Sequence, residues 1–185
     1  NWIDFLGSPK TKPMPISDFE DLCAGKGPQF AVHSVSFVPE LTPADNDQIP
    51  VPDLDSLVIC PWDKTCAWVF ADLYWNDKPY DVCPRMTLKR QIKKCEKSDL
   101  KFFVGIEPEF FLMKWDGDKP VKAIDRDPIP LRRQAFGYDA EYSIDGMNFL
   151  KEIIDILNND LKWDLHDVVA EGAYGQYELD FGYTD

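Results

Sequence analysis

An apolar, aromatic-rich run from Lys101 to Met113 carries two glutamates in its middle, Glu107 and Glu109. Its length and its Val and Phe content predict a β-strand. Because side chains alternate across a strand, the two carboxylates point to one face, about 6.5–7 Å apart. Like charges this close are costly in a half-buried setting, so either one takes up a proton or a cation lies between them. On this stretch alone, an edge strand with two hydrated glutamates remains open.

A second acidic stretch places Glu171 and Glu178 on either side of a glycine-bearing turn. Glycines let the backbone approach closely or adopt a positive φ, so such a turn can hold both carboxylates near a common point. In the strand predicted after the turn, Gln176, Glu178 and Asp180 share one face.

A helix is predicted between the two acidic stretches, capped by Ser143 or Asp145 and ending near Asn159. A helix in this position allows the acidic strands to be neighbours in one sheet, as in a β-α-β unit. Four glutamates can then converge: Glu107, Glu109, Glu171 and Glu178. Oxygen-only ligands favour Mg²⁺ or Mn²⁺ over zinc or copper, and two such ions suit phosphoryl transfer from a nucleotide.

The composition excludes several classes of protein. The net charge of −13 and the lack of a basic run argue against nucleic acid as a partner, and no stretch approaches the roughly 18 apolar residues of a membrane span. Five cysteines without Cys-x-x-Cys spacing indicate reduced thiols, and we expect a cytoplasmic protein. The start without Met and the end directly after a strand suggest a fragment.

The whole pattern predicts an α+β protein with two domains. Short strands and hairpins fill the first part, including a strand at Phe30–Phe37 and a proline-rich loop at Pro39–Pro52. A helix is predicted from Pro84, at its favoured first position, to Lys97. The boundary is placed at the start of this helix, giving domains 1–84 and 85–185.

Several motifs occur in a characteristic order and spacing along most of the chain. The acidic pieces are the most specific. The motifs are Trp2-Ile3-Asp4-x2-Gly7, Pro52-Asp53 followed by Cys60-Pro61-Trp62, Pro84-Arg85-x2-Leu88, Gly105-x-Glu107-x-Glu109-Phe110-Phe111-Leu112, Tyr138-Asp139, and Glu171-x6-Glu178. Together, in this order and spacing, they resemble the glutamine synthetase superfamily.

The resemblance implies an N-terminal β-grasp domain and the incomplete start of a catalytic domain with a curved antiparallel sheet. It implies activation of the γ-carboxylate of glutamate by ATP, followed by attack of ammonia or a small amine on the acyl phosphate. Glu109, Glu171 and Glu178 match ligands of the metal on the acceptor side, and Glu107 matches a ligand of the metal at the nucleotide phosphates. The family forms rings, so the resemblance also implies a homo-oligomer, a dodecamer or decamer.

One departure concerns the acceptor. Relatives that use ammonia carry two aspartates before the Pro-Asp motif, and a gapless count places Asp47 on the second and His33 on the first. A histidine binds a cation more weakly at neutral pH, which favours an organic amine as the acceptor. Alternatively, the count is out of register and His33 is an ordinary strand residue.

Two other functions fit the acidic pattern less well. A non-catalytic homologue would be free to lose four clustered charges, so their presence argues against it. A hydrolase with a carboxylate pair needs one group on each side of the scissile bond, which two residues on one strand face do not supply. The resemblance places the ATP- and glutamate-binding residues beyond residue 185.

Overall fold

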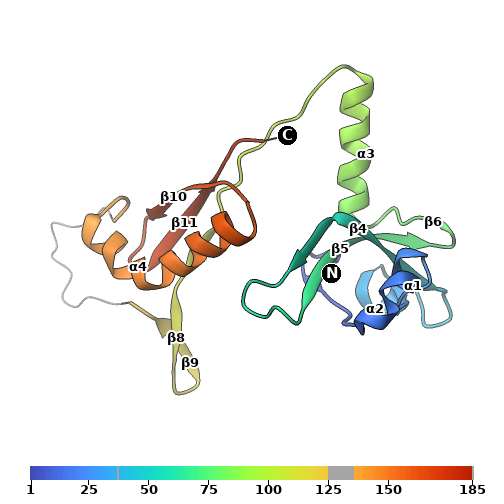
Figure 1. Ribbon diagram of the computed structural model, residues 1–185, viewed down its shortest axis with the longest axis horizontal. Helices are drawn as coiled ribbons and strands as arrows, with labels where there is room; N and C mark the ends of the chain where they lie inside the picture. Colours follow the sequence, from blue (N-terminus) through green and yellow to red (C-terminus); the bar gives the residue numbers. More distant parts are fainter. Residues whose placement is uncertain (37, 125–135, 185) are drawn as a thin grey trace. The chain divides into compact units, whose positions relative to one another are not determined.

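The computed structural model describes residues 1–36, 38–124 and 136–184. The chain divides into two compact units, Asn1–Phe102 and Phe103–Asp185, each combining helices with antiparallel strands (Figure 1). The α+β class predicted from the sequence is therefore confirmed. Among the described residues, every helix is too short or too polar to cross a membrane.

The first unit is built on a four-stranded antiparallel sheet in the order β3-β4-β5-β6, with a two-stranded β1-β2 ribbon beside it. Its strands are β1 (Trp2–Ile3), β2 (Pro9–Lys10), β3 (Phe30–Ala31), β4 (Asp47–Ile59), β5 (Ala67–Trp75) and β6 (Lys78–Pro79). Its helices are a 3₁₀ turn η1 (Ile16–Asp18), α1 (Phe19–Cys23), α2 (Val32–Ser36) and α3 (Pro84–Lys97).

The helix predicted at Pro84–Lys97 is confirmed as α3. Its first two turns are held to the sheet because Arg85 and Lys89 form ion pairs with Asp53 on β4 and Asp72 on β5. These pairs hold the pKa of Asp53 below its usual value, against the opposing effect of burial.

Two predictions in this unit are wrong. The strand predicted at Phe30–Phe37 ends at Ala31, and α2 begins at Val32, because a short apolar run does not distinguish strand from helix. Phe37 itself lies outside the described residues.

The loop predicted at Pro39–Pro52 ends earlier, since β4 begins at Asp47. β3 pairs only with the first two residues of β4. The prolines of β4, Pro50 and Pro52, therefore lie beyond the part of the strand that pairs with β3, where a proline is tolerated.

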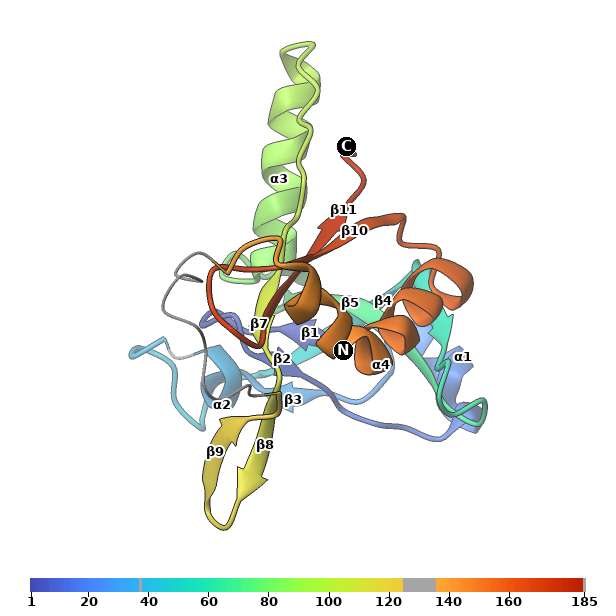
Figure 2. The same ribbon diagram turned by 90° about the vertical axis from the view of Figure 1, so that its left-hand side faces the viewer.

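The second unit contains a three-stranded antiparallel sheet in the order β10-β11-β7 and a separate β8-β9 hairpin (Figure 2). Its strands are β7 (Glu109–Phe111), β8 (Met113–Asp116), β9 (Lys119–Lys122), β10 (Leu165–Ala170) and β11 (Gln176–Phe181). Its helix α4 (Ala140–Asp155) continues into a π-helical turn η2 (Ile156–Asp160).

Helix α4 packs against one face of the three-stranded sheet through buried aromatic residues. The hydroxyl of Tyr177 donates to the Tyr142 carbonyl at 2.9 Å, and the hydroxyl of Tyr174 donates to Asp145 at 2.8 Å. Gly146 lets the helix approach, since a Cβ there would lie 2.5 Å from Cζ of Tyr177. Asp139 caps the helix instead of the predicted Ser143 or Asp145, accepting from the amides of two first-turn residues.

The single strand predicted at Lys101–Met113 is much shorter in the structure, where only Glu109–Phe111 forms β7. Pro108 has no N–H to donate, which removes one hydrogen bond of a regular ladder, and the amide of Val104 instead donates to the carbonyl of Thr184, beyond the end of β11. The carbonyls of Pro108 and Ile106 accept from the amides of Leu179 and Phe181. The prediction that the two acidic strands are neighbours in one sheet is confirmed, because β7 pairs with β11, although the pairing is antiparallel and not the parallel one of a β-α-β unit.

Candidate metal centre

Strand register places the acidic side chains on the sheet face opposite α4. Tyr177 pairs with Phe110 and Ala170, and this set is turned toward the helix. The next residue, Glu178, pairs with Glu109. Because side chains alternate across a strand, Glu178 and Glu109 project together from the other face.

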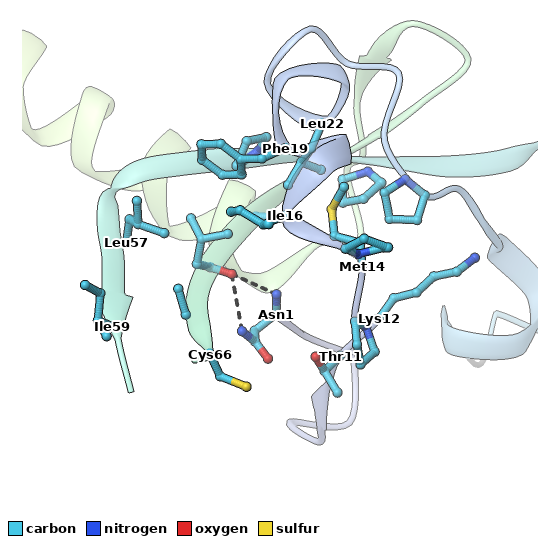
Figure 3. Close-up of a pocket in the computed structure, with 18 of the residues that line it drawn as sticks. Asn1, Thr11, Lys12, Met14, Ile16, Phe19, Leu22, Leu57, Ile59 and Cys66 are labelled. Carbon is cyan, nitrogen blue, oxygen red and sulfur yellow. Dashed lines mark hydrogen bonds between the residues drawn. The ribbon is translucent and has the colours of Figure 1, made fainter. Parts of the chain in front are cut away.

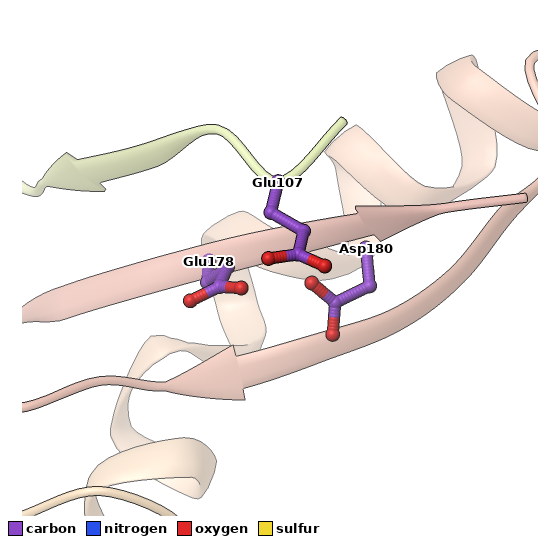
Figure 4. A group of neighbouring side chains, drawn as sticks. All are labelled: Glu107, Glu178 and Asp180. Atoms are coloured by element: carbon purple, nitrogen blue, oxygen red, sulfur yellow. The ribbon is translucent and has the colours of Figure 1, made fainter. Parts of the chain in front are cut away.

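Five carboxylates on this face form two groups of three that share Glu178. One group joins Glu107, Glu178 and Asp180 (Figure 4), and the other joins Glu109, Glu171 and Glu178. In each group the three residues offer oxygen atoms that lie within 4.8 Å of one another. The four glutamates singled out from the sequence are therefore brought together.

The carboxylates come from several pieces of backbone, with Glu178 and Asp180 on β11 and Glu109 on β7. Glu107 lies on the irregular segment whose carbonyls bond to β11. Glu171 follows β10 directly, and its carboxylate accepts from the amide of Gly172 at 2.9 Å. The turn that follows uses Gly175 at a φ of 83°, the left-handed conformation predicted for a glycine in this turn.

The electrostatic cost of this arrangement falls on Glu178. Burial, hydrogen bonding to Glu171 and Asp180, and repulsion from both carboxylates raise the pKa of Glu178 to about 7. A carboxylate surrounded by others either holds a proton or gives it up to a cation. Those are the two outcomes that the sequence predicted for clustered carboxylates.

The residues present fit a hard divalent ion. The donor set consists of oxygen atoms, which Mg²⁺ and Mn²⁺ prefer. In addition, Oδ1 of Asp180 is buried and has no hydrogen-bond partner among the described residues, although its side chain faces Glu107 and Glu178 (Figure 4). A buried oxygen of this kind is an available ligand atom.

Asp180 is the site residue that the sequence reasoning missed. The signal was present, because Asp180 falls on the same strand face as Glu178 by simple alternation. None of the acidic motifs of the family resemblance extends to Asp180, so strand alternation alone indicates it.

A cavity lies in the first unit and differs in character from the acidic face (Figure 3). Its volume is about 610 Å³, and apolar residues such as Met14, Phe19 and Leu57 line it. The described residues around it include no carboxylate and no imidazole. It therefore lacks the carboxylate oxygens that the acidic face offers to Mg²⁺ or Mn²⁺.

Comparison with known proteins gives the acidic face its context. The sequence profile of the glutamine synthetase catalytic domain matches residues 81–185. The chain belongs to the glutamine synthetase family. The match contains both carboxylate groups, so the acidic face lies within the part of this glutamine synthetase family member that corresponds to the catalytic domain.

Individual relatives include proteins named glutamine synthetase and glutamate–methylamine ligase. The chain is 31% identical to a glutamine synthetase of Rhizobium meliloti and 27% identical to a glutamate–methylamine ligase of Methyloversatilis universalis. Each alignment covers 100% of this chain and 40% of the relative. A solved structure of a GmaS/ADP complex superimposes with a TM-score of 0.83 at 29% identity, over 100% of this chain and 40% of that one. The chain thus spans about 40% of the length of these relatives.

The two residues predicted at the acceptor side of this glutamine synthetase family member both lie in the first unit. His33 is on α2, with Nε2 3.3 Å from the hydroxyl of Ser34 and Nδ1 buried without a hydrogen-bond partner in the described part of the chain. Asp47 opens β4 as an exposed residue opposite Ala31. Their role toward an acceptor stays a prediction.

Proposed function

We propose that this chain is the N-terminal part of an ATP-dependent ligase. The enzyme joins the γ-carboxylate of glutamate to ammonia or a small amine through a γ-glutamyl phosphate. The observation that carries the proposal is the pair of carboxylate groups that share Glu178 on one face of the sheet. In this proposal residues 1–84 form the family's β-grasp domain, and residues 85–185 form the start of its catalytic domain with its curved sheet.

The two groups would hold two ions with separate tasks. Glu109, Glu171 and Glu178 would hold the ion on the acceptor side, and Glu107, with Glu178 and Asp180, the ion at the nucleotide phosphates. When bound, Mg²⁺ or Mn²⁺ neutralises charge on a transferring phosphoryl group and aligns it with the carboxylate that receives it. The strand register fixes the carboxylates beforehand, which lowers the cost of assembling the site.

The acceptor is proposed from His33. If it occupies the position of an ammonium-binding aspartate, the site loses a permanent negative charge and favours an organic amine. Asp47 would remain as the second acidic group. Similarity to both a glutamine synthetase and a glutamate–methylamine ligase is compatible with either acceptor.

The assembly and location are proposed from the family. We expect a ring-shaped homo-oligomer, a dodecamer or decamer, in which the N-terminal domain of one subunit completes the site of its neighbour. The residues that bind ATP and glutamate are expected beyond residue 185. All five cysteines are free thiols, in keeping with the expected cytoplasmic location.

The proposal is tested by removing one ligand in the full-length natural protein. Glu109→Ala or Glu171→Ala should each abolish Mn²⁺ binding at one site and stop amine-dependent release of ADP from ATP and glutamate. Glu152→Ala, which removes an exposed glutamate on α4 of the same unit, is the matched control and should retain both. Unchanged turnover in the Glu109 and Glu171 variants would rule out the ligase role of these residues.

A further inference from the structure

We infer that Gln176 is a positioning residue that holds Glu109 and Glu171 in place for the acceptor-side ion. The inference rests on the proposed metal site. It concerns a side chain that belongs to neither group of carboxylates.

The side chain of Gln176 reaches Glu109 across two strands. Its Nε2 donates to Oε2 of Glu109 at 2.6 Å. Gln176 lies opposite Phe111 in the β11–β7 register, so the contact to Glu109 runs diagonally between the strands. A hydrogen bond to a carboxylate is stronger than one between neutral groups, and here it restrains an otherwise exposed side chain.

The backbone of the same residue fixes the other member of the group. The carbonyl of Gln176 accepts from the amide of Glu171 at 3.0 Å, and its amide donates to the carbonyl of Ala173 at 3.0 Å. Gln176 therefore closes the turn that carries Glu171 and at the same time orients Glu109. One residue therefore restrains the side chain of Glu109 on β7 and the backbone of Glu171 after β10.

The amide is chemically suited to this position. Three carboxylates within 4.8 Å repel one another, and a hydrogen-bond donor to one of them reduces that cost. A lysine would also donate, but its charge would compete with the cation. Hydrogen bonds of this kind around ligating carboxylates fix their orientation and raise metal affinity.

The first test measures Mn²⁺ affinity in Gln176→Met by titration calorimetry. Methionine keeps the length of the side chain and the two backbone hydrogen bonds of the turn but removes the donor. Binding at the Glu109–Glu171–Glu178 site should weaken by about 10- to 100-fold, the usual cost of losing such a contact. Binding at the other site should change by no more than about twofold. Gln91→Met, at an exposed glutamine on α3, is the control.

The second test separates positioning from a general effect on the turn. In the metal-free protein, any shift of the urea-unfolding midpoint caused by Gln176→Met should disappear in a Glu109→Ala background, because the side chain acts on Glu109 and the backbone bonds of the turn remain. Gln176→Ser, which cannot reach Glu109, replaces the methionine variant if the latter does not fold. Wild-type Mn²⁺ affinity in the single variant, or an equal shift of the urea midpoint with and without the Glu109 side chain, would overturn the inference. Unchanged Mn²⁺ binding in Glu109→Ala alone would instead overturn the proposed site.

Discussion

At Glu178 several physical effects act in the same direction. Partial burial, hydrogen bonds and the negative charges of Glu171 and Asp180 all favour the protonated carboxyl, and the pKa rises to about 7. A bound cation would reverse this preference, because metal ligands are deprotonated. Proton release and cation binding at this residue are therefore coupled.

This coupling predicts a pH dependence of stability without metal. The pKa of Glu178 is about 7 in the folded protein against an ordinary value of 4.5, so between these values the folded state holds a proton that the unfolded chain has released. The free energy of unfolding should therefore fall as pH rises through this window. Urea unfolding of the wild type and Glu178→Gln at pH 4 to 8 measures the difference, and the variant should lack this part of the slope.

Metal binding should show the opposite trend. The affinity for Mn²⁺ should increase as pH rises toward 7 and then level off, with protons released on binding near neutral pH. Calorimetry in buffers of different ionisation enthalpy counts those protons. A stability slope that persists in Glu178→Gln would assign the pH dependence to other groups. Mn²⁺ binding without proton release would contradict the coupling at Glu178.

At the scale of elements, the acidic face depends on what packs behind it. Tyr177 alternates with Glu178 along β11, so the packing of Tyr177 under α4 sets the position of the carboxylate on the other face. The close approach of Gly146 to the Tyr177 ring leaves no room for a side chain there.

Gly146→Ala should therefore destabilise the second unit. Alanine has the better helix propensity, but its Cβ would lie 2.5 Å from the Tyr177 ring, and overpacking of a core typically costs about 1–3 kcal/mol. Urea denaturation followed by circular dichroism measures the loss. Gly137→Ala, where nothing lies within 4 Å of the added Cβ, is the control. Equal stability of the two variants would show that α4 can shift away from the sheet.

The elements differ in how well the sequence predicts them. Pro84 marks the start of α3 by a local rule, and the range Pro84–Lys97 is confirmed. The run Lys101–Met113 looks like one strand, but Pro108 has no amide N–H to donate to a neighbouring strand. Only the backbone pairing with β11 shows that the strand is limited to Glu109–Phe111. The placement of β11 between β7 and β10 depends on contacts distant in sequence, which periodicity does not reveal.

The candidate site was easier to predict than the strands around it. Alternation along a strand and the two glutamate motifs identify Glu107, Glu109, Glu171 and Glu178, and the structure brings them together. Alternation places Asp180 and Gln176 on the same strand face as Glu178. Their contacts with the other carboxylates depend on strand register and on a turn hydrogen bond. Those are properties of the folded chain.

At the scale of the whole molecule, the chain forms two units and spans about 40% of the length of its relatives. The four glutamates lie in the second unit and His33 and Asp47 in the first. The predicted metal ligands and the predicted acceptor-side residues thus lie in separate units of the chain. The acceptor must therefore be identified with the full-length protein.

A screen of acceptors with the full-length protein addresses this question. With glutamate and ATP, we expect ADP release to be faster with methylamine, ethanolamine or a polyamine than with ammonia, because a neutral histidine attracts ammonium less than an aspartate does. His33→Asp should move the preference toward ammonia. A clear preference of the wild type for ammonia would contradict the interpretation of His33.

The number of Mn²⁺ ions bound to the wild type and to three variants decides whether the acidic face is a two-ion site that shares Glu178. We predict two ions for the wild type, one each for Glu171→Gln and Asp180→Asn, and none held tightly by Glu178→Gln. The Glu152→Gln control should bind two. Equal stoichiometry in the wild type and Glu178→Gln would contradict a shared ligand and leave the five carboxylates as a hydrated acidic surface.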